Sequence, residues 1–178
     1  MVTQQCLVLI KPDGLAKSLT GNIMTSLSET KLKIVAAKIV RVSKELAEAH
    51  YSELRQKQIE KHGEKKGIAV FENVLRYIQG EYHTDRVFAL VYEGDDAINK
   101  IRALAGSTNP EDADPTTIRG KYGRINSKTQ VYENVVHVSD SEISAKREIQ
   151  LWFEPEELTD TIYPTRKEKT SMDKIAWA

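Results

Sequence analysis

The chain has 178 residues, and its 26 basic and 26 acidic side chains give a formal net charge of zero at pH 7. This balance excludes the overall basic excess that is typical of nucleic-acid-binding proteins, so any cationic site must be local. A chain of this length can bury the core of one domain, and its single cysteine excludes an internal disulfide framework and a zinc cluster built from cysteines.

The single cysteine, Cys6, lies in the apolar segment QQCLVLI, which is typical of a buried thiol in a reducing compartment. We see no signal-peptide pattern at the N-terminus, and no apolar run approaches the about 18 residues of a membrane span. We therefore expect a cytoplasmic protein without a membrane partner.

The first part of the chain predicts a strand, a helix and a second strand. Residues 6–10 form a continuous apolar run that ends at Lys-Pro-Asp-Gly, which indicates a buried strand followed by a turn. Thr20 or Asn22 can cap the helix that follows. The segment KIVAAKIVRV, from Lys33, is rich in β-branched residues and predicts the second strand.

Two helical patterns follow, separated by a charged stretch. Ser43 can cap a helix from which His50 and Tyr51 project. Residues 56–67 are rich in charge and contain two glycines, so we expect a solvated helix end and an inserted loop there. Helical periodicity resumes at VFENVLRYIQ, from Val70.

A third strand from Arg86 leads to a helix that Asp95 or Asp96 can cap and that Gly106 closes. Residues 107–123 contain two prolines and no apolar period. A loop of this length is either functional or disordered.

The segment VYENVVHV, residues 131–138, alternates as a strand does and places His137 at the strand's end. Ser139 and Glu142 have the spacing of a capping box, and Asp140 could cap the next helix instead. A strand end that faces a helix N-terminus suits an anion. A lone histidine in an apolar run is, however, more often a structural residue, so this segment alone does not decide its role.

The resulting order of strands and helices predicts an α+β fold. It matches a ferredoxin-like split βαβ arrangement, in which a four-stranded antiparallel sheet is covered by helices. This architecture hosts many functions, including nucleic-acid binding, so it names none of them.

Four motifs, IKPDG, GSTNP, TIRG and NVVHVSDS, occur in one order along the chain. Together they resemble the nucleoside diphosphate kinase family over about Cys6 to Leu158. The resemblance implies one kinase-like domain at residues 1–158, with the inserted loop at 56–67, and a C-terminal extension at 159–178. It also implies transfer of a terminal phosphoryl group from a nucleoside triphosphate to a nucleoside diphosphate, through a phosphohistidine and with ping-pong kinetics.

By this resemblance His137 is the nucleophile, and Glu148 hydrogen-bonds its imidazole and fixes which ring nitrogen attacks. His50 stands where the family often has a histidine. Six positions match family residues that bind the phosphates and the ribose: Lys11, Tyr51, Arg102, Thr108, Arg119 and Asn134. Lys11 and Tyr51 are also expected to be catalytic. The expected cofactor is Mg²⁺ carried by the nucleotide phosphates, with no metal ligand from the protein.

The residue types fit this chemistry independently, because a phosphoryl transition state spreads negative charge over its oxygens and needs positioned donors. Each residue alone also has a simpler interpretation. Arg102 could be a solvated helix residue, Lys11 a charge at a strand end and Tyr51 an aromatic at the edge of the core. Arg119 lies in a long loop and is less easily set aside, and Glu148 could face solvent. Their joint occurrence in family order favours the functional interpretation.

The sequence departs from the family at two places. The residue after the catalytic histidine is normally glycine or alanine, but here it is Val138, and a valine would be costly if that backbone needs an unusual φ. The base clamp of phenylalanine and leucine is replaced, in our best register, by Val70 and Val74, with Phe71 adjacent. These departures motivate a second hypothesis, a catalytically weak nucleotide-binding or regulatory member.

A third hypothesis, a nucleic-acid-binding sheet, is disfavoured by the zero net charge and the 7% aromatic content. The family resemblance implies a homo-oligomer, either a hexamer or a tetramer. The loop around Pro110 and the tail with Ile175 and Trp177 are candidate contacts.

Overall fold

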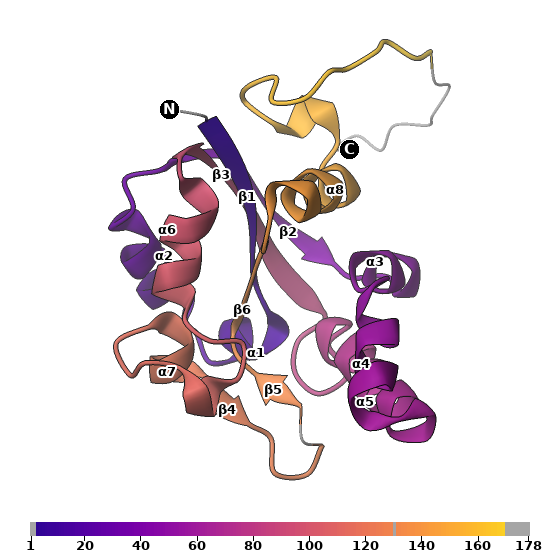
Figure 1. Ribbon diagram of the computed structural model, residues 1–178. Helices are drawn as coiled ribbons and strands as arrows, with labels where there is room; N and C mark the ends of the chain where they lie inside the picture. The colour runs from indigo at the N-terminus through magenta and orange to yellow at the C-terminus, as the bar shows by residue number, and fades with distance from the viewer. Residues whose placement is uncertain (1–2, 130, 170–178) are drawn as a thin grey trace, which may run out of the picture.

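The computed structural model describes residues 3–129 and 131–169 (Figure 1). Its centre is a sheet with the strand order β2-β3-β1-β6, in which every neighbouring pair is antiparallel. The four strands are β1 (Thr3–Ile10), β2 (Lys33–Arg41), β3 (Arg86–Asp95) and β6 (Val136–Val138). This order confirms the predicted ferredoxin-like arrangement.

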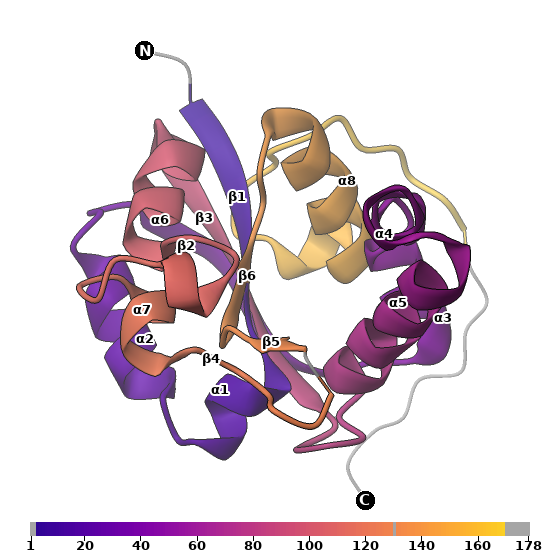
Figure 2. The same ribbon diagram turned by 60° about the horizontal axis from the view of Figure 1, so that its bottom comes forward.

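Side-chain alternation along β1 divides the core into two layers. Cys6, Val8 and Ile10 face a cluster completed by α2 (Thr20–Ser28) and α6 (Ala97–Ala105). Leu7 and Leu9 face the opposite cluster, which contains side chains of the helices α3 (Lys44–His50), α5 (Glu64–Ile78) and α8 (Glu142–Trp152). Figure 2 shows these two groups of helices on opposite sides of the sheet. Apolar runs as continuous as residues 6–10 are expected when both faces of a strand are buried.

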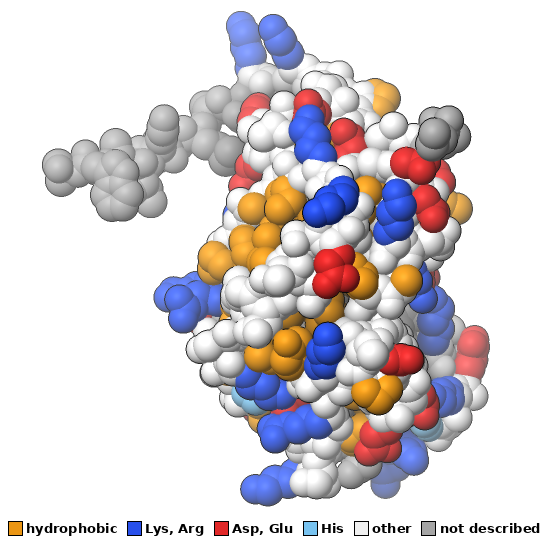
Figure 3. All heavy atoms as spheres, turned by 90° about the vertical axis from the view of Figure 1, so that its left-hand side faces the viewer, with side chains coloured by type: hydrophobic (Ala, Val, Ile, Leu, Met, Phe, Trp, Pro, Cys, Tyr) orange, Lys and Arg blue, Asp and Glu red, His pale blue; other side chains and the backbone are white. Residues whose placement is uncertain are grey.

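Most of the remaining elements are short. They are the helices α1 (Pro12–Ala16), α4 (Leu54–His62) and α7 (Ile118–Tyr122), the 3₁₀ turns η1 (Pro110–Asp112) and η2 (Pro155–Glu157), and the hairpin of β4 (Arg124–Ile125) with β5 (Tyr132–Glu133). The loop expected at residues 107–123 thus contains η1 and α7. On the face of the molecule beside α2 and α6, basic and acidic side chains are interspersed (Figure 3).

The prediction of a loop at residues 56–67 is wrong, because this stretch belongs to a pair of packed helices, α4 and α5. Gly63 ends α4 with φ of 80°, a conformation that side-chain-bearing residues rarely adopt. Gly67 allows the helices to touch, since a Cβ there would lie 2.6 Å from the backbone of Gln58 and of Ile59. The charged side chains cover the outside of this helical hairpin.

The predicted helix starts were correct in some places and wrong in others. Ser43 accepts a hydrogen bond from the N–H of Leu46 and caps α3, and Gly106 ends α6 as predicted. The helix α2 begins at Thr20 without a side-chain cap, so neither proposed cap acts there. The helix α8 is capped by Ser141, which accepts from the N–H of Ser144, and the expected capping box is absent from it.

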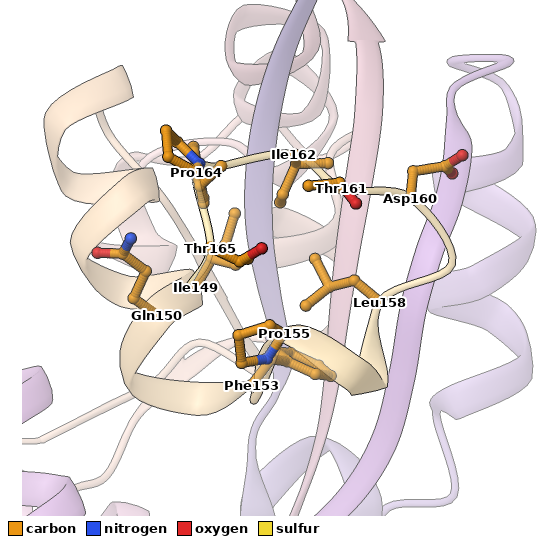
Figure 4. A pocket seen from close by; sticks show the side chains of 11 residues that line it. Ile149, Gln150, Phe153, Pro155, Leu158, Asp160, Thr161, Ile162, Pro164 and Thr165 are labelled. Carbon is orange, nitrogen blue, oxygen red and sulfur yellow. The ribbon is translucent and has the colours of Figure 1, made fainter. Parts of the chain in front are cut away.

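The described part of the C-terminal extension packs against β2 and α8. The N–H of Thr159 donates to the carbonyl of Val35 over 2.9 Å, and Asp160 pairs with Lys33. Side chains of this segment and α8 line a cavity of about 70 Å³, with Ile149 and Ile162 in its lining (Figure 4). This volume is far below the roughly 300 Å³ or more of a typical ligand pocket, so this cavity is too small to hold a ligand of ordinary size.

Among the described residues, no helix is both long enough and apolar enough to cross a membrane.

Candidate active site

Three of the sequence motifs meet at the end of β1. Lys11 follows this strand, and its ammonium donates to Oδ1 of Asn134 over 2.6 Å and to the carbonyl of Tyr132 over 3.3 Å. The side-chain amide of Asn134 in turn donates to the carbonyl of Thr108 over 2.8 Å. The IKPDG, GSTNP and NVVHVSDS segments are therefore joined through a single asparagine side chain.

A tight backbone turn precedes the histidine. Val135 has φ of 56°, and the N–H of Val136 donates to the carbonyl of Asn134 over 2.7 Å, which forms a γ-turn. A positive φ is strained for a β-branched residue and persists only where neighbouring contacts hold it. Oδ2 of Asp13 accepts from the N–H of Val135, and the N–H of Lys11 donates to the Val135 carbonyl over 2.8 Å.

The unusual φ that we considered at Val138 therefore lies at Val135 instead. Val138 is a regular strand residue that pairs with Val8, and its buried side chain belongs to the core. The backbone gives no reason for valine to be costly at position 138.

His137 lies on β6 with its side chain 20% exposed. Its Nε2 is 3.1 Å from Oε2 of Glu148, and because a carboxylate only accepts, Nε2 carries the proton. The neutral ring then has its free lone pair on Nδ1. Glu148 is buried on α8 and also accepts from the hydroxyl of Ser139 over 2.7 Å, so it is not a solvent-facing residue.

Burial alone would raise the pKa of Glu148, but hydrogen bonds from His137 and Ser139 and the charge of Arg147 outweigh it and lower the pKa. The carboxylate is therefore charged at neutral pH. It can both hold the imidazole and stabilise a positive charge that develops on the ring.

His50 packs against His137 from the end of α3. Its ring is 4.4 Å from that of His137 in an edge-to-face arrangement, and its Nδ1 accepts from the indole N–H of Trp152 over 3.1 Å. Burial, and then the charges of His137 and Arg147, hold the pKa of His50 well below its usual value, so the ring is neutral.

Three potential metal ligands, His50, His137 and Glu148, lie within 4.8 Å of one another. Because Trp152 donates to Nδ1 of His50, the proton of His50 must be on Nε2, which has no hydrogen-bond partner within residues 3–129 and 131–169. This ring therefore offers an N–H group instead of the lone pair that a metal requires.

One cation, Arg119, and one phenol, Tyr51, complete the cluster. Arg119, on α7, is buried and donates from Nη1 to the carbonyl of Gly106 over 2.8 Å and from Nη2 to the carbonyl of Val136 over 3.1 Å. Burial and the charge of Arg102 lower the pKa of Arg119 to about 10, so it remains protonated at pH 7. Tyr51, half-buried beside His50, has its pKa raised by burial and by the charge of Glu148, and its hydroxyl keeps its proton.

The other predicted residues lie further out. Arg102 is exposed on α6, although close enough for its charge to act on Arg119 and Asp140. Val70 and Val74 lie one turn apart on α5, and the structure does not place them in the hydrogen-bonded cluster around His137. Phe71 packs against the core cluster on the α3 side of the sheet. The base clamp thus stays a prediction.

Several residues that position this site were not predicted from the sequence. Asp13 accepts from the backbone of the turn at Val135, Ser139 donates to Glu148, and Trp152 donates to His50. Glu133, a fully buried carboxylate, was not predicted either. The available signal was a charged residue within the otherwise apolar alternation of residues 131–138.

Comparison with known proteins decides the family. A model of the family described as nucleoside diphosphate kinase matches residues 4–158. The chain belongs to the nucleoside diphosphate kinase family. As a member, it is a phosphotransferase that acts on nucleoside di- and triphosphates.

Individual relatives agree with this membership. A nucleoside diphosphate kinase of Listeria monocytogenes is 43% identical over 155 residues, which cover 87% of this chain and 92% of the relative. One of Methanosphaera stadtmanae is 40% identical over 161 residues, covering 90% and 93%. A solved structure described as a transition state mimic of the Borrelia burgdorferi kinase, with bound vanadate and ADP, has a TM-score of 0.76 and 34% identity and covers 93% and 94%.

A structure of the Halobacterium salinarum nucleoside diphosphate kinase in complex with CDP has a TM-score of 0.73 and 36% identity, covering 89% of this chain and 93% of the other. The similarity thus extends over almost the whole length of each protein.

We predict that Glu148→Gln slows phosphoryl transfer about 10- to 100-fold. The amide keeps an oxygen that can accept from Nε2 of His137 in one of its two orientations, but the other orientation presents an N–H group and favours a proton on Nδ1. The rate is measured under single-turnover conditions with Glu142→Gln, an exposed residue of the same helix, as the control. An unchanged rate would show that Glu148 does not select the attacking nitrogen.

Proposed function

We propose that Nδ1 of His137 carries the phosphoryl group between nucleotides in a ping-pong reaction. The observation that supports this most directly is the hydrogen bond from Nε2 to Glu148, since it leaves the Nδ1 lone pair free. In the first half-reaction Nδ1 attacks the terminal phosphorus of the triphosphate. The N–P bond forms as the bond to the bridging oxygen breaks, and the diphosphate leaves with that electron pair. The second half-reaction reverses these steps with another diphosphate.

The surrounding residues suit the charge that develops on the phosphoryl oxygens. We propose that Lys11, Arg119 and Arg102 bind the phosphates as cations, and that the hydroxyl groups of Tyr51 and Thr108 donate as neutral groups. Asn134 accepts from Lys11 and donates to the Thr108 carbonyl, and we propose that it also contacts the ribose. Val70 and Val74 are the proposed base contacts.

The family is one of nucleotide kinases, which generally use Mg²⁺. The donor set here suits phosphates more than a bare metal ion, because Glu148 accepts from His137 and Ser139 and Asp13 from the backbone of Val135. We propose that the ion is carried by the nucleotide phosphates, where it neutralises charge, without a ligand from the protein.

The alternative of a catalytically weak, binding-only member is not favoured. A binding module needs no nucleophile with an oriented tautomer, and both halves of the His137 and Glu148 pair are in place. Val138, the main motive for this alternative, has ordinary strand geometry.

The mechanism is tested by initial-rate kinetics with ATP varied at several fixed concentrations of a second diphosphate. A phosphoenzyme route gives parallel double-reciprocal lines, because the first product leaves before the second substrate binds. Intersecting lines would require both nucleotides on the enzyme at once and would contradict the proposal.

We further propose one kinase domain at residues 1–158, with the 56–67 insertion folded as helices, and an extension at 159–178. A cytoplasmic location is supported by Cys6, a buried free thiol whose pKa burial raises to about 12. Such a thiol is unreactive and needs no oxidising compartment.

A homo-oligomer, either a hexamer or a tetramer, is also proposed. Its support is the edge strand β2, where Ile34 and Ile39 are 41% and 56% exposed. Of the contacts predicted from sequence, Pro110 is itself buried within the chain, and Ile175 and Trp177 lie outside the described residues. Sedimentation as a monomer of 20.1 kDa would contradict this proposal.

A further inference from the structure

A carboxylate outside the proposed phosphate-binding set is the most heavily hydrogen-bonded side chain near it. Glu133 is fully buried at the end of β5. Its partners come from four parts of the chain and are the hydroxyl of Tyr77 at 2.9 Å, Nδ2 of Asn126 at 2.9 Å, Nε2 of His83 at 3.3 Å, Nε of Arg124 at 2.6 Å and Nζ of Lys17 at 3.7 Å.

This arrangement keeps the carboxylate charged. Burial alone would raise the pKa of Glu133, but hydrogen bonds from Arg124, Asn126 and Tyr77 outweigh it and lower the pKa to about 2. A buried charge is tolerated only where several partners satisfy it, and removing it leaves the partners unpaired. Glu133 therefore ties β5 to α5, to the loop before β3 and to the β4 side of the hairpin.

The two residues that flank Glu133 perform a different task. Lys11 donates to the carbonyl of Tyr132 and to the side chain of Asn134, and Asn134 also holds Thr108. Successive side chains of an extended segment point to opposite sides. The three-residue segment 132–134 thus has Glu133 anchored on one side and Lys11 bound on the other.

Lys11 has little freedom to compensate if this segment moves. It is buried, and burial together with the charge of Arg119 lowers its pKa, so the ammonium depends on its oxygen partners. Two of those partners belong to Tyr132 and Asn134. A shift of the segment would displace the cation and the Thr108 carbonyl together.

We propose that Glu133 is a positioning residue for nucleotide binding, which places Lys11 through segment 132–134. This inference rests on the proposed contact of Lys11 with the nucleotide phosphates. It gives Glu133 a role that differs from a purely structural one, because the effect must pass through Lys11.

The test is calorimetric titration of the full chain with ADP and Mg²⁺, well below the lowest melting temperature of the variants. Glu133→Gln has one acceptor oxygen in place of two, and we expect it to raise the Kd about 10-fold. Tyr77→Phe removes one donor without changing shape and should raise the Kd about 3-fold. Glu81→Gln is the matched control, because Glu81 also accepts from an arginine, Arg76, near the end of α5 but is about half exposed.

A double-mutant cycle shows whether the effect passes through Lys11. Lys11→Gln should weaken ADP binding, and adding Glu133→Gln to it should cause little further loss. Losses that add fully, or an unchanged Kd in a Glu133→Gln protein with a lowered melting temperature, would overturn the inference and leave a structural role. If that variant does not fold, Tyr77→Phe decides in the same way.

The proposed function can fail separately. If Lys11→Gln itself leaves the Kd unchanged, the contact of Lys11 with phosphate is wrong, and the positioning role fails with it. If Lys11→Gln weakens binding while the Glu133 and Tyr77 variants do not, only the positioning role fails.

Discussion

Replacing His137 with alanine is expected to lower phosphoryl transfer from ATP to a nucleoside diphosphate by at least about 10⁴-fold, because the variant has no nitrogen to form the covalent intermediate. Nearby groups do not replace it. His50 is neutral and presents an N–H group, and the hydroxyl of Tyr51 has a raised pKa and remains protonated.

The control for this variant is His62→Asn, at the end of α4 and outside the four sequence motifs, which should keep the wild-type rate. The side chain of His137 is only 20% exposed and is bonded to the buried Glu148, so its truncation should lower the melting temperature, and the rate is compared on protein shown to be folded. ADP binding should also persist. A folded His137→Ala protein that retains more than about a hundredth of the wild-type activity would contradict the nucleophile assignment.

The second large effect is expected at Arg119. We predict that Arg119→Met lowers the rate of phosphoryl transfer about 10³-fold, because the proposed role of this buried cation is to stabilise the negative charge that develops in the transition state. The rate of Arg119→Lys should fall between those of the wild-type protein and Arg119→Met. Lysine keeps the charge but loses the planar guanidinium that donates to the carbonyls of Gly106 and Val136.

Arg119 also donates hydrogen bonds to two backbone carbonyls, so the stability of the Arg119→Met protein must be measured together with its rate of phosphoryl transfer. Arg55→Met, an exposed arginine on α4, is the control for charge removal and should leave both unchanged. If Arg119→Met loses stability but a single-turnover rate on the folded protein stays within about tenfold of wild type, then Arg119 is structural and does not bind the phosphoryl group.

The fold could be predicted where the sequence pattern reflects local geometry. The continuous apolar run at residues 6–10 predicted a buried strand, and this is the inner strand β1, whose side chains enter both core clusters. The helical structure of residues 56–67 could not be predicted in this way, because its outer faces are highly charged and the contact that unites α4 and α5 depends on Gly67 meeting the backbone of Gln58. Residues nine apart in sequence form that contact, which no periodicity shows.

In the site, too, the residues within sequence motifs were predicted and the long-range contacts that support them were not. The family motifs predicted Lys11, Asn134 and Thr108, which the structure joins, and the His137 and Glu148 pair. The supporting contacts are long-range: Asp13 meets Val135, and Trp152 meets His50 across about a hundred residues of chain. Only the folded sheet brings these segments together, so the strained turn at Val135, the tautomer of His50 and the burial of Glu133 had no signature in the sequence beyond residue type.

A phosphohistidine at His137 is tested most directly by intact-mass spectrometry of the purified protein after brief incubation with ATP and Mg²⁺, beside the His137→Ala variant. We expect one acid-labile phosphoryl adduct on the wild-type protein, which disappears when a nucleoside diphosphate is added and never forms on the variant. A folded wild-type protein that transfers phosphate to the diphosphate without any adduct, or an adduct that survives in the variant, would contradict a phosphohistidine at His137.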